Sequence, residues 1–221
     1  ETVAFIGSTG SGKSTLINLV PRFYDATEGE ILVDGVNVKD YKLTSLYNKI
    51  GYVAQKAVIF NDTVSGNVSY GDNGKGEIST EKVKEAIEVA QGKDFVEKME
   101  NSYDTQMAQG GSNVSGGQKQ RISIARAIAR NPEIYIFDDS FSALDYKTDS
   151  ILRKELKKYT KDATTLIVAQ RIGTIMNADK ILVLDEGNLV GMGTHKELLE
   201  SCEVYKQIAL SQLSKEELDN A

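Results

Sequence analysis

The apolar positions along the chain fall into short uninterrupted runs separated by stretches with helical spacing. Four such runs predict buried strands, at residues 3–6, 134–137, 165–168 and 181–184. Helices are expected to begin near residues 115, 144 and 195, the last behind a capping pattern at residues 194–197. Strands that alternate with helices predict an α/β fold whose mostly parallel sheet is covered on both faces.

Three further stretches have a different pattern. Residues 29–38 contain two short β runs around an Asp-Gly pair, which predicts a small antiparallel hairpin. Residues 51–55 predict a strand that ends on the amide of Gln55. From residue 56 to about 113, polar loops separate amphipathic segments, one of them behind Ser79 or Thr80 as its N-cap. We interpret this part as a largely helical insertion.

Composition narrows the class of protein. A chain of 221 residues can bury a core as one domain, and its net charge of −6 argues against nucleic acid as the main partner. No apolar run approaches the ~20 residues of a membrane span, and no N-terminal signal sequence is visible. The single Cys202 excludes internal disulfides and fits a reducing compartment, and with the single His195 it cannot build a zinc site.

The most informative stretch follows the first predicted strand and opens a helix expected over residues 14–20. It matches the pattern G-x-x-x-x-G-K-[ST] and reads Gly7-Ser8-Thr9-Gly10-Ser11-Gly12-Lys13-Ser14-Thr15. Glycines let backbone N–H groups face an anion, and the helix start adds the positive end of its dipole. Lys13 is expected to reach the β- and γ-phosphates of a nucleotide, and Ser14 to help hold Mg²⁺. The alternative is an ordinary Gly/Ser-rich turn.

A second helix start, at residues 115–118, has the same character. Ser115 and Gln118 form a capping box, yet Gly116 and Gly117 occupy the first turn. Each glycine costs up to about 1 kcal/mol of helix stability relative to alanine, so something is expected to lie close to the backbone there. The alternative is a glycine-rich helix cap.

Taken together, the motifs resemble those of ABC-type ATPases, in order and spacing, over nearly the whole chain. Those motifs are the phosphate loop (Walker A), Gln55, the signature at residues 115–121, the strand ending at Asp138, residues 142–145 and Gln170. The segments at residues 55–64 and 194–198 resemble the exporter branch, the bacterial multidrug-type half-transporters.

The resemblance implies a division of the chain. Residues 1–56 and 126–200 are expected to form a RecA-like P-loop NTPase core with a small β portion, and residues 57–125 a helical subdomain that includes the signature helix. Residues 201–221 are expected to form a C-terminal helix and tail. The N-terminal strands usual in the family, and the aromatic residue that stacks on adenine there, are expected to be missing.

The resemblance also implies roles for single residues. Asp138 takes the Walker B position and would hold Mg²⁺ through water, and Gln55 would complete the Mg²⁺ shell and position water. Their structural alternatives are a turn-forming aspartate and a solvated strand end. The signature residues would contact the ATP of a second nucleotide-binding domain, and Asp145, in a D-loop, would contact that partner. The signature set is Ser115, Gly116, Gly117 and Gln118.

Two of the positions with an implied catalytic role depart from the family pattern. Asp139 stands where the family has a catalytic glutamate, which withdraws the carboxylate by somewhat more than 1 Å. Gln170 stands where the family has a switch histidine, and glutamine cannot carry a proton. We therefore expect a chain that binds Mg-ATP but hydrolyses it weakly, while its signature completes the site of a different partner chain.

The implied function is ATP-driven export at the cytoplasmic face of the cell membrane, with a transmembrane domain fused upstream and no nucleic acid as partner. Two alternatives stay open at this point. One is a non-transport ABC ATPase of the DNA-repair or translation type, which would carry coiled-coil arms or basic surfaces. The other is a regulatory nucleotide-binding subunit without significant hydrolysis, which Asp139 and Gln170 make plausible.

Overall fold

The structure, a computed structural model, describes residues 1–71 and 73–213, which form two compact units. The first unit contains Glu1–Lys42, Ile136–Ser142 and the described residues from Thr164 onward. The second contains Leu43–Tyr135 and Ala143–Ala163. Within the described ranges, no helix combines the length and the apolar character that a bilayer crossing requires.

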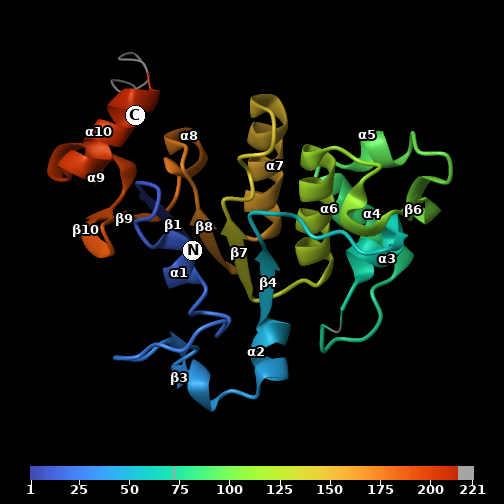
Figure 1. Cartoon of the computed structure of the whole chain (residues 1–221), viewed down its shortest axis with the longest axis horizontal. Helices are drawn as coiled ribbons and strands as arrows, with labels where there is room; N and C mark the ends of the chain where they lie inside the picture. The colour runs from blue at the N-terminus through green and yellow to red at the C-terminus, as the bar shows by residue number, and fades with distance from the viewer. Residues whose placement is uncertain (72, 214–221) are drawn as a thin grey trace. The chain divides into compact units, whose positions relative to one another are not determined.

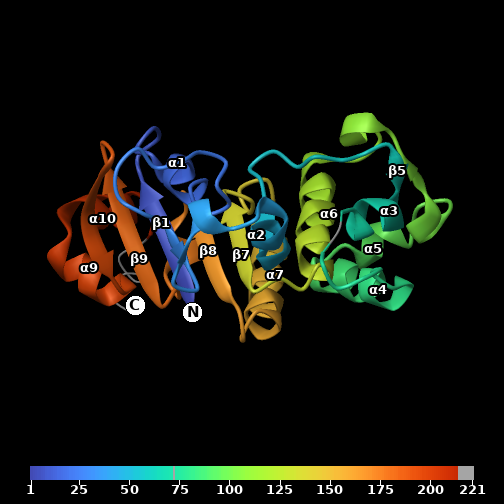
Figure 2. The same cartoon turned by 90° about the horizontal axis from the view of Figure 1, so that it is seen from below.

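The first unit is built on a sheet in which the strand order is β10-β9-β1-β8-β7 (Figures 1 and 2). β1 pairs in parallel with β8 and β9, whereas β10 runs antiparallel to β9. The parallel strands fall on the apolar runs of the sequence, as predicted, but β10 was not predicted. The bounds are β1 (Thr2–Gly7), β7 (Ile134–Asp138), β8 (Thr164–Val168), β9 (Lys180–Asp185) and β10 (Asn188–Gly193).

Helices of the first unit pack on this sheet. Helix α1 (Lys13–Ile17) contacts β1 and β8, and α10 (Glu203–Gln212) contacts β1 and β9. Helix α1 is shorter than the predicted residues 14–20, and after Ile17 the Leu19 and Val20 amides donate to the carbonyls three residues before them, as in turns. The remaining helices here are α8 (Ile172–Ile175) and α9 (His195–Ser201), the latter starting on the predicted capping box of Thr194 and Glu197.

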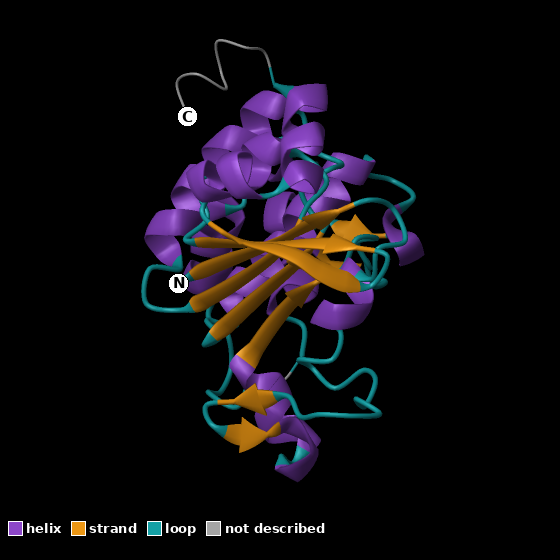
Figure 3. Cartoon of the chain, turned by 90° about the vertical axis from the view of Figure 1, so that its left-hand side faces the viewer, coloured by secondary structure: helices purple, strands orange, loops and turns teal. Residues whose placement is uncertain are grey.

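The predicted hairpin forms a small two-stranded sheet of β2 (Leu32–Val33) and β3 (Val36–Asn37). Its turn residues Asp34 and Gly35 have φ values of 51° and 77°, the left-handed pair that a tight hairpin turn requires. Figure 3 shows this hairpin as two short strands separate from the twisted fan of the larger sheet.

The second unit is mostly helical. Ser79, rather than Thr80, caps α4 by accepting a hydrogen bond from the Lys82 amide. The two-stranded pair β5–β6 was not predicted. Strand β4 (Ile50–Val53) neighbours β7, whose first two residues belong to this unit. The other bounds are α2 (Leu43–Lys49), β5 (Asp62–Thr63), α3 (Val64–Ser69), α4 (Thr80–Val89), α5 (Lys93–Val96), β6 (Gln106–Met107), α6 (Gly116–Ala129) and α7 (Tyr146–Tyr159).

Candidate functional site

The carboxyl ends of β1, β7 and β8 carry most of the residues that the sequence singled out. Since parallel strands end at one edge of their sheet, the loops after them meet there. The phosphate loop follows β1, Asp138 and Asp139 close β7, and Gln170 follows β8. All of these residues belong to the first unit, so one compact body brings together four of the predicted motifs.

The backbone of the phosphate loop depends on glycine at two kinds of position. A Cβ atom on Gly7 would lie 2.0 Å from the carbonyl oxygen of Leu184, so no side chain fits there. Gly10 and Gly12 have φ values of 82° and 94°, in the left-handed region that favours glycine. Gly12 is the N-cap of α1 and provides no side-chain hydrogen bond to the helix start.

Lys13 is held inside this loop. Its Nζ donates to the carbonyl oxygens of Gly7 at 2.9 Å and Ser8 at 2.7 Å, and to Ser11 Oγ at 3.1 Å. Only 9% of the residue is exposed. Burial lowers the pKa of the Lys13 ammonium below its ordinary value, and the carboxylates of Asp139 and Asp138 oppose that shift without cancelling it. The lysine that the sequence predicted to contact the phosphates is therefore a partly desolvated cation inside the loop.

Ser14 and Asp138 connect the loop to β7. The Ser14 hydroxyl donates to Asp138 Oδ1 at 2.7 Å, although the two residues are 124 positions apart in the sequence. Asp138 is buried, whereas Ser14 is exposed. A hydroxyl and a carboxylate oxygen at this spacing are the hard donors that Mg²⁺ prefers, so these two residues fit the metal that the sequence predicted.

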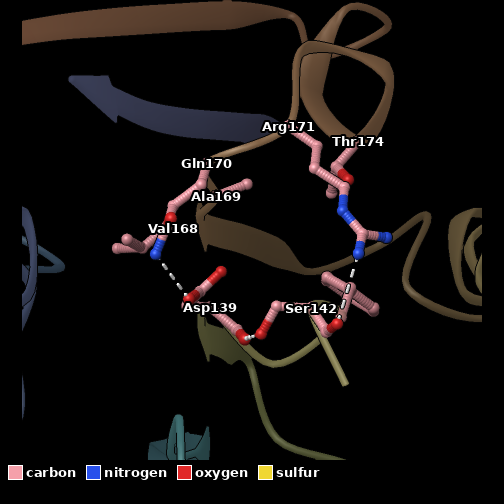
Figure 4. Close-up of a pocket in the computed structure, with 8 residues that line it drawn as sticks. Asp139, Ser142, Val168, Ala169, Gln170, Arg171 and Thr174 are labelled. Atoms are coloured by element: carbon pink, nitrogen blue, oxygen red, sulfur yellow. Dashed lines mark hydrogen bonds between the residues drawn. The ribbon is translucent and has the colours of Figure 1, made fainter. Parts of the chain in front are cut away.

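Asp139 and Gln170 form a pair at the neighbouring strand ends. Gln170 Nε2 donates to Asp139 Oδ2 at 2.9 Å, and Figure 4 shows the two side chains pointing toward one another. Asp139 has a φ of 46°, a left-handed conformation that aspartate adopts more readily than most residues. Its amide donates to the Val168 carbonyl at 2.9 Å, and its own carbonyl accepts from Ser142 Oγ at 2.8 Å.

Beside this pair is a small cavity of about 10 Å³, roughly the space that one water molecule needs. The cavity is lined by polar and apolar groups from the loops after β7 and β8 (Figure 4). Across it, Arg171 Nη2 donates to the Ser142 carbonyl at 3.3 Å. The loop carrying Gln170 is thus tied to the loop carrying Asp139 by backbone and side-chain contacts.

The signature residues lie in the second unit, at the start of α6. The Gln118 amide donates to Ser115 Oγ at 3.3 Å, and the Ser115 amide donates to Gln118 Oε1 at 2.9 Å, so the predicted capping box is confirmed. A Cβ on Gly117 would lie 3.2 Å from the Ala143 carbonyl oxygen, whereas a Cβ on Gly116 would meet nothing within 4 Å. The expected close approach therefore exists at the second glycine, and the chain itself provides it.

Asp145 and Gln55 also belong to the second unit. Asp145 is the N-cap of α7, because its Oδ1 accepts from the Thr148 amide at 2.9 Å. Hydrogen bonds from the side chain and the amide of Thr148 hold the pKa of the Asp145 carboxyl below its usual value. Gln55 follows β4. Sequence reasoning missed Gln120, a buried residue of α6 whose Nε2 donates at 3.1 Å to the carbonyl of Ala54, the residue before Gln55.

A known protein family and several known sequences are similar to this chain. The family described as "ABC transporter" matches residues 1–142. Putative multidrug export ATP-binding/permease proteins of Staphylococcus aureus strains NCTC 8325 and Mu50 are 48% identical to this chain over 208 residues. The matched part is 94% of this chain but 36% of those relatives, so the chain spans about a third of their length.

A solved structure agrees with this result. The structure of a bacterial Atm1-family ABC exporter with ATP bound superposes with a TM-score of 0.92 at 38% sequence identity. The similarity covers 97% of this chain and 37% of that one. Fold and sequence comparisons thus point to the same group of proteins as the motifs.

Proposed function

The chain belongs to the ABC transporter family as a nucleotide-binding domain homologous to multidrug-type exporter proteins, and we propose that it binds Mg-ATP at the phosphate loop. The observation that carries the proposal is Lys13, a buried cation inside a turn where Gly7 leaves no room for a side chain and where Gly10 and Gly12 have left-handed φ values. The loop's other predicted nucleotide contacts are Ser8, Thr9, Gly10, Ser11, Gly12 and Thr15. When bound, Mg²⁺ would be held by Ser14 and Asp138, with Gln55 as a further ligand, and would neutralise phosphate charge.

We further propose that this chain's own catalytic site is degenerate. The Asp139 carboxylate accepts a hydrogen bond from the neutral amide of Gln170 rather than from an imidazole that could take up a proton. The aspartate is also one methylene shorter than the glutamate expected from the family pattern, which misplaces the charge by more than about 1 Å. Both features reduce activation of an attacking water while leaving the phosphate contacts of Lys13 unchanged.

The signature start completes the proposal. Ser115, Gly116, Gly117 and Gln118 would contact the ATP held by a second nucleotide-binding domain on a different chain, and Asp145 would lie near that interface. ATP-driven association of the two domains would then power export. This role places the chain at the cytoplasmic face of a membrane, joined to a transmembrane domain of the kind that the name permease implies for the relatives.

The predicted division of the chain is part of the same proposal. Residues 1–56 and 126–200 would form the RecA-like core with its β portion, and residues 57–125 would form a helical subdomain that includes the signature helix. The alternative of a regulatory subunit that binds ATP without significant turnover is favoured by the same Asp139–Gln170 pair.

The experiment is a comparison of ATP turnover by the wild-type chain and the double variant Asp139→Glu with Gln170→His. We expect the double variant to hydrolyse ATP at least about tenfold faster, with little change in nucleotide affinity, because it restores the carboxylate reach and the titratable group. The matched control is Asp139→Gln with Gln170→His, which has the length of glutamate but no charge. Wild-type turnover equal to that of the double variant would contradict the degenerate-site proposal.

A further inference from the structure

We propose that Gln212, the last residue of α10, is a positioning residue that sets the direction of the Gln170 side chain, an inference that rests on the proposed nucleotide-binding function. Gln212 Nε2 donates to the carbonyl oxygen of Gln170 at 2.8 Å. Its Oε1 accepts from the amide of Ile172, also at 2.8 Å. One side chain therefore spans the loop between β8 and α8 with two hydrogen bonds.

The loop requires these bonds from elsewhere in the chain. Helix α8 has only four residues, and its N-cap, Arg171, provides no side-chain hydrogen bond. The Ile172 amide is one of the donors that a helix start leaves without an intrahelical partner, and Gln212 satisfies it. The Ala169 amide is already held by the Phe5 carbonyl at 3.1 Å. The backbone around Gln170 is thus fixed by β1 before it and by α10 after it.

The sequence of α10 explains why Gln212 reaches the loop. Tyr205 and Ala209 are both fully buried, and Gln212 follows them at i+7 and i+3, on the same face of the helix. The Tyr205 hydroxyl is 2.6 Å from His195 Nδ1, which ties α10 to α9. An anchored helix face therefore delivers the amide of Gln212 to the loop.

The direction of the Gln170 side chain is expected to affect the preference for ATP over ADP. The Gln170 side chain now points to Asp139, and in the proposed function it lies near the γ-phosphate, which ATP has and ADP lacks. If the backbone of Gln170 loses its bond from Gln212, its side chain samples more directions and contacts the γ-phosphate less often. The preference for ATP over ADP should then fall, while ADP affinity stays the same.

Two substitutions of Gln212 distinguish the effects of its two hydrogen bonds. Gln212→Met removes both, whereas Gln212→Glu keeps an acceptor for the Ile172 amide but loses the donor to the Gln170 carbonyl. The matched control is Gln207→Met on the same helix, where the glutamine only donates to Glu203 at 3.3 Å on the exposed surface. Because Gln212 is itself exposed, its substitution should leave the fold intact.

Two readouts test the inference: dissociation constants for Mg-ATP and Mg-ADP by calorimetry, and hydrogen exchange of the peptide covering residues 169–176 without nucleotide. We expect Gln212→Met to lower the ATP-over-ADP preference by about three- to tenfold and to speed exchange at Ile172. Gln212→Glu should lower the preference but keep Ile172 protected, and Gln207→Met should match the wild type in both.

Faster exchange in Gln212→Met with an unchanged ATP-over-ADP preference would overturn the inference, because the contact would then be only structural. Unchanged exchange and preference together would overturn it as well. A wild-type chain that bound neither nucleotide would overturn the proposed function and this role with it, whereas the exchange result would still show whether Gln212 holds the loop. The two failures are therefore distinguishable.

Discussion

The two helix starts that the sequence marked as anion-ready, those of α1 and α6, differ in how their backbone donors are satisfied. At α1 the N-cap is Gly12, which provides no side-chain bond, and Lys13 brings a buried positive charge. At α6 the N-cap is Ser115, whose hydroxyl and amide are both engaged with Gln118. The α1 start has no side-chain cap, whereas at the α6 start the Gln118 amide is already bonded to the Ser115 side chain.

Two glycine-rich helix starts can therefore differ in how strongly each favours an anion. A helix whose first turn is already capped gains less from an anion, because the ligand must compete with the capping bonds. The α1 start combines a helix start without a side-chain cap with a lysine and the Ser14–Asp138 pair, and this combination is why we propose it as the site of a magnesium nucleotide. We expect the α6 start to contribute only when a partner presents a nucleotide already bound.

The largest predicted effect is that of Gly7→Ala. The new Cβ would lie 2.0 Å from a backbone oxygen, which cannot rotate away as a side chain would. We expect a loss of about 3 kcal/mol or more in the free energy of unfolding, together with loss of ATP binding. Urea unfolding monitored by circular dichroism measures it. The control is Gly10→Ala, where a Cβ meets nothing within 4 Å and only the left-handed backbone adds a cost of about 1–2 kcal/mol.

At the start of α6, a glycine-to-alanine change is predicted to raise the stability slightly, whereas Gly7→Ala lowers it. Gly116→Ala adds a methyl group in open space inside the first turn of α6, so the helix should gain up to about 1 kcal/mol in stability. Affinity for ATP at the phosphate loop of the same chain should not change. Thermal unfolding with calorimetry of nucleotide binding would check both, and a drop in ATP affinity would contradict the separation of the two starts. Gly117→Ala, with its Cβ at 3.2 Å from the Ala143 carbonyl oxygen, provides the comparison.

The smallest effect is a dependence of stability on pH. Burial lowers the pKa of Lys13 in the folded chain, so the folded state binds fewer protons than the unfolded state between that lowered pKa and the ordinary lysine value of 10.5. The charged lysine therefore costs stability at neutral pH, and this cost is relieved as the pH rises through the folded pKa. Relative to Lys13→Met, the wild type should gain stability as the pH rises from the lowered folded-state pKa of Lys13 toward 10.5, as urea unfolding would measure. A pH-independent difference would show that Lys13 is not desolvated.

Local patterns predicted much of this molecule because the relevant information lies within a few residues. The apolar runs gave the parallel strands, the Asp34-Gly35 pair gave the hairpin, and Ser115 with Gln118 gave the start of α6. The expectation that Ser14 and Asp138 share one site came from the resemblance to ABC-type ATPases, and their side chains are hydrogen-bonded in the structure.

Other features depend on contacts that no local pattern reveals. Strand β10 exposes Leu189, Val190 and Met192 and contains two glycines, so its sequence has neither the burial nor the clean alternation of a typical strand. Its pairing with β9 stabilises it instead. Gln212 contacts the Gln170 loop from 42 positions away, and only the packing of α10 on the sheet brings it there.

Lys13 and Ser115 are expected to differ in how much each contributes to Mg-ATP affinity, and calorimetry of Mg-ATP binding to the single variants measures this difference. We predict that Lys13→Ala weakens Mg-ATP binding by about a hundredfold, because it removes the cation from the phosphate loop, whereas Ser115→Ala leaves the affinity within about twofold of the wild type. Equal affinities in the wild type and Lys13→Ala, or an equal loss in both variants, would contradict the assignment of the nucleotide to the α1 start.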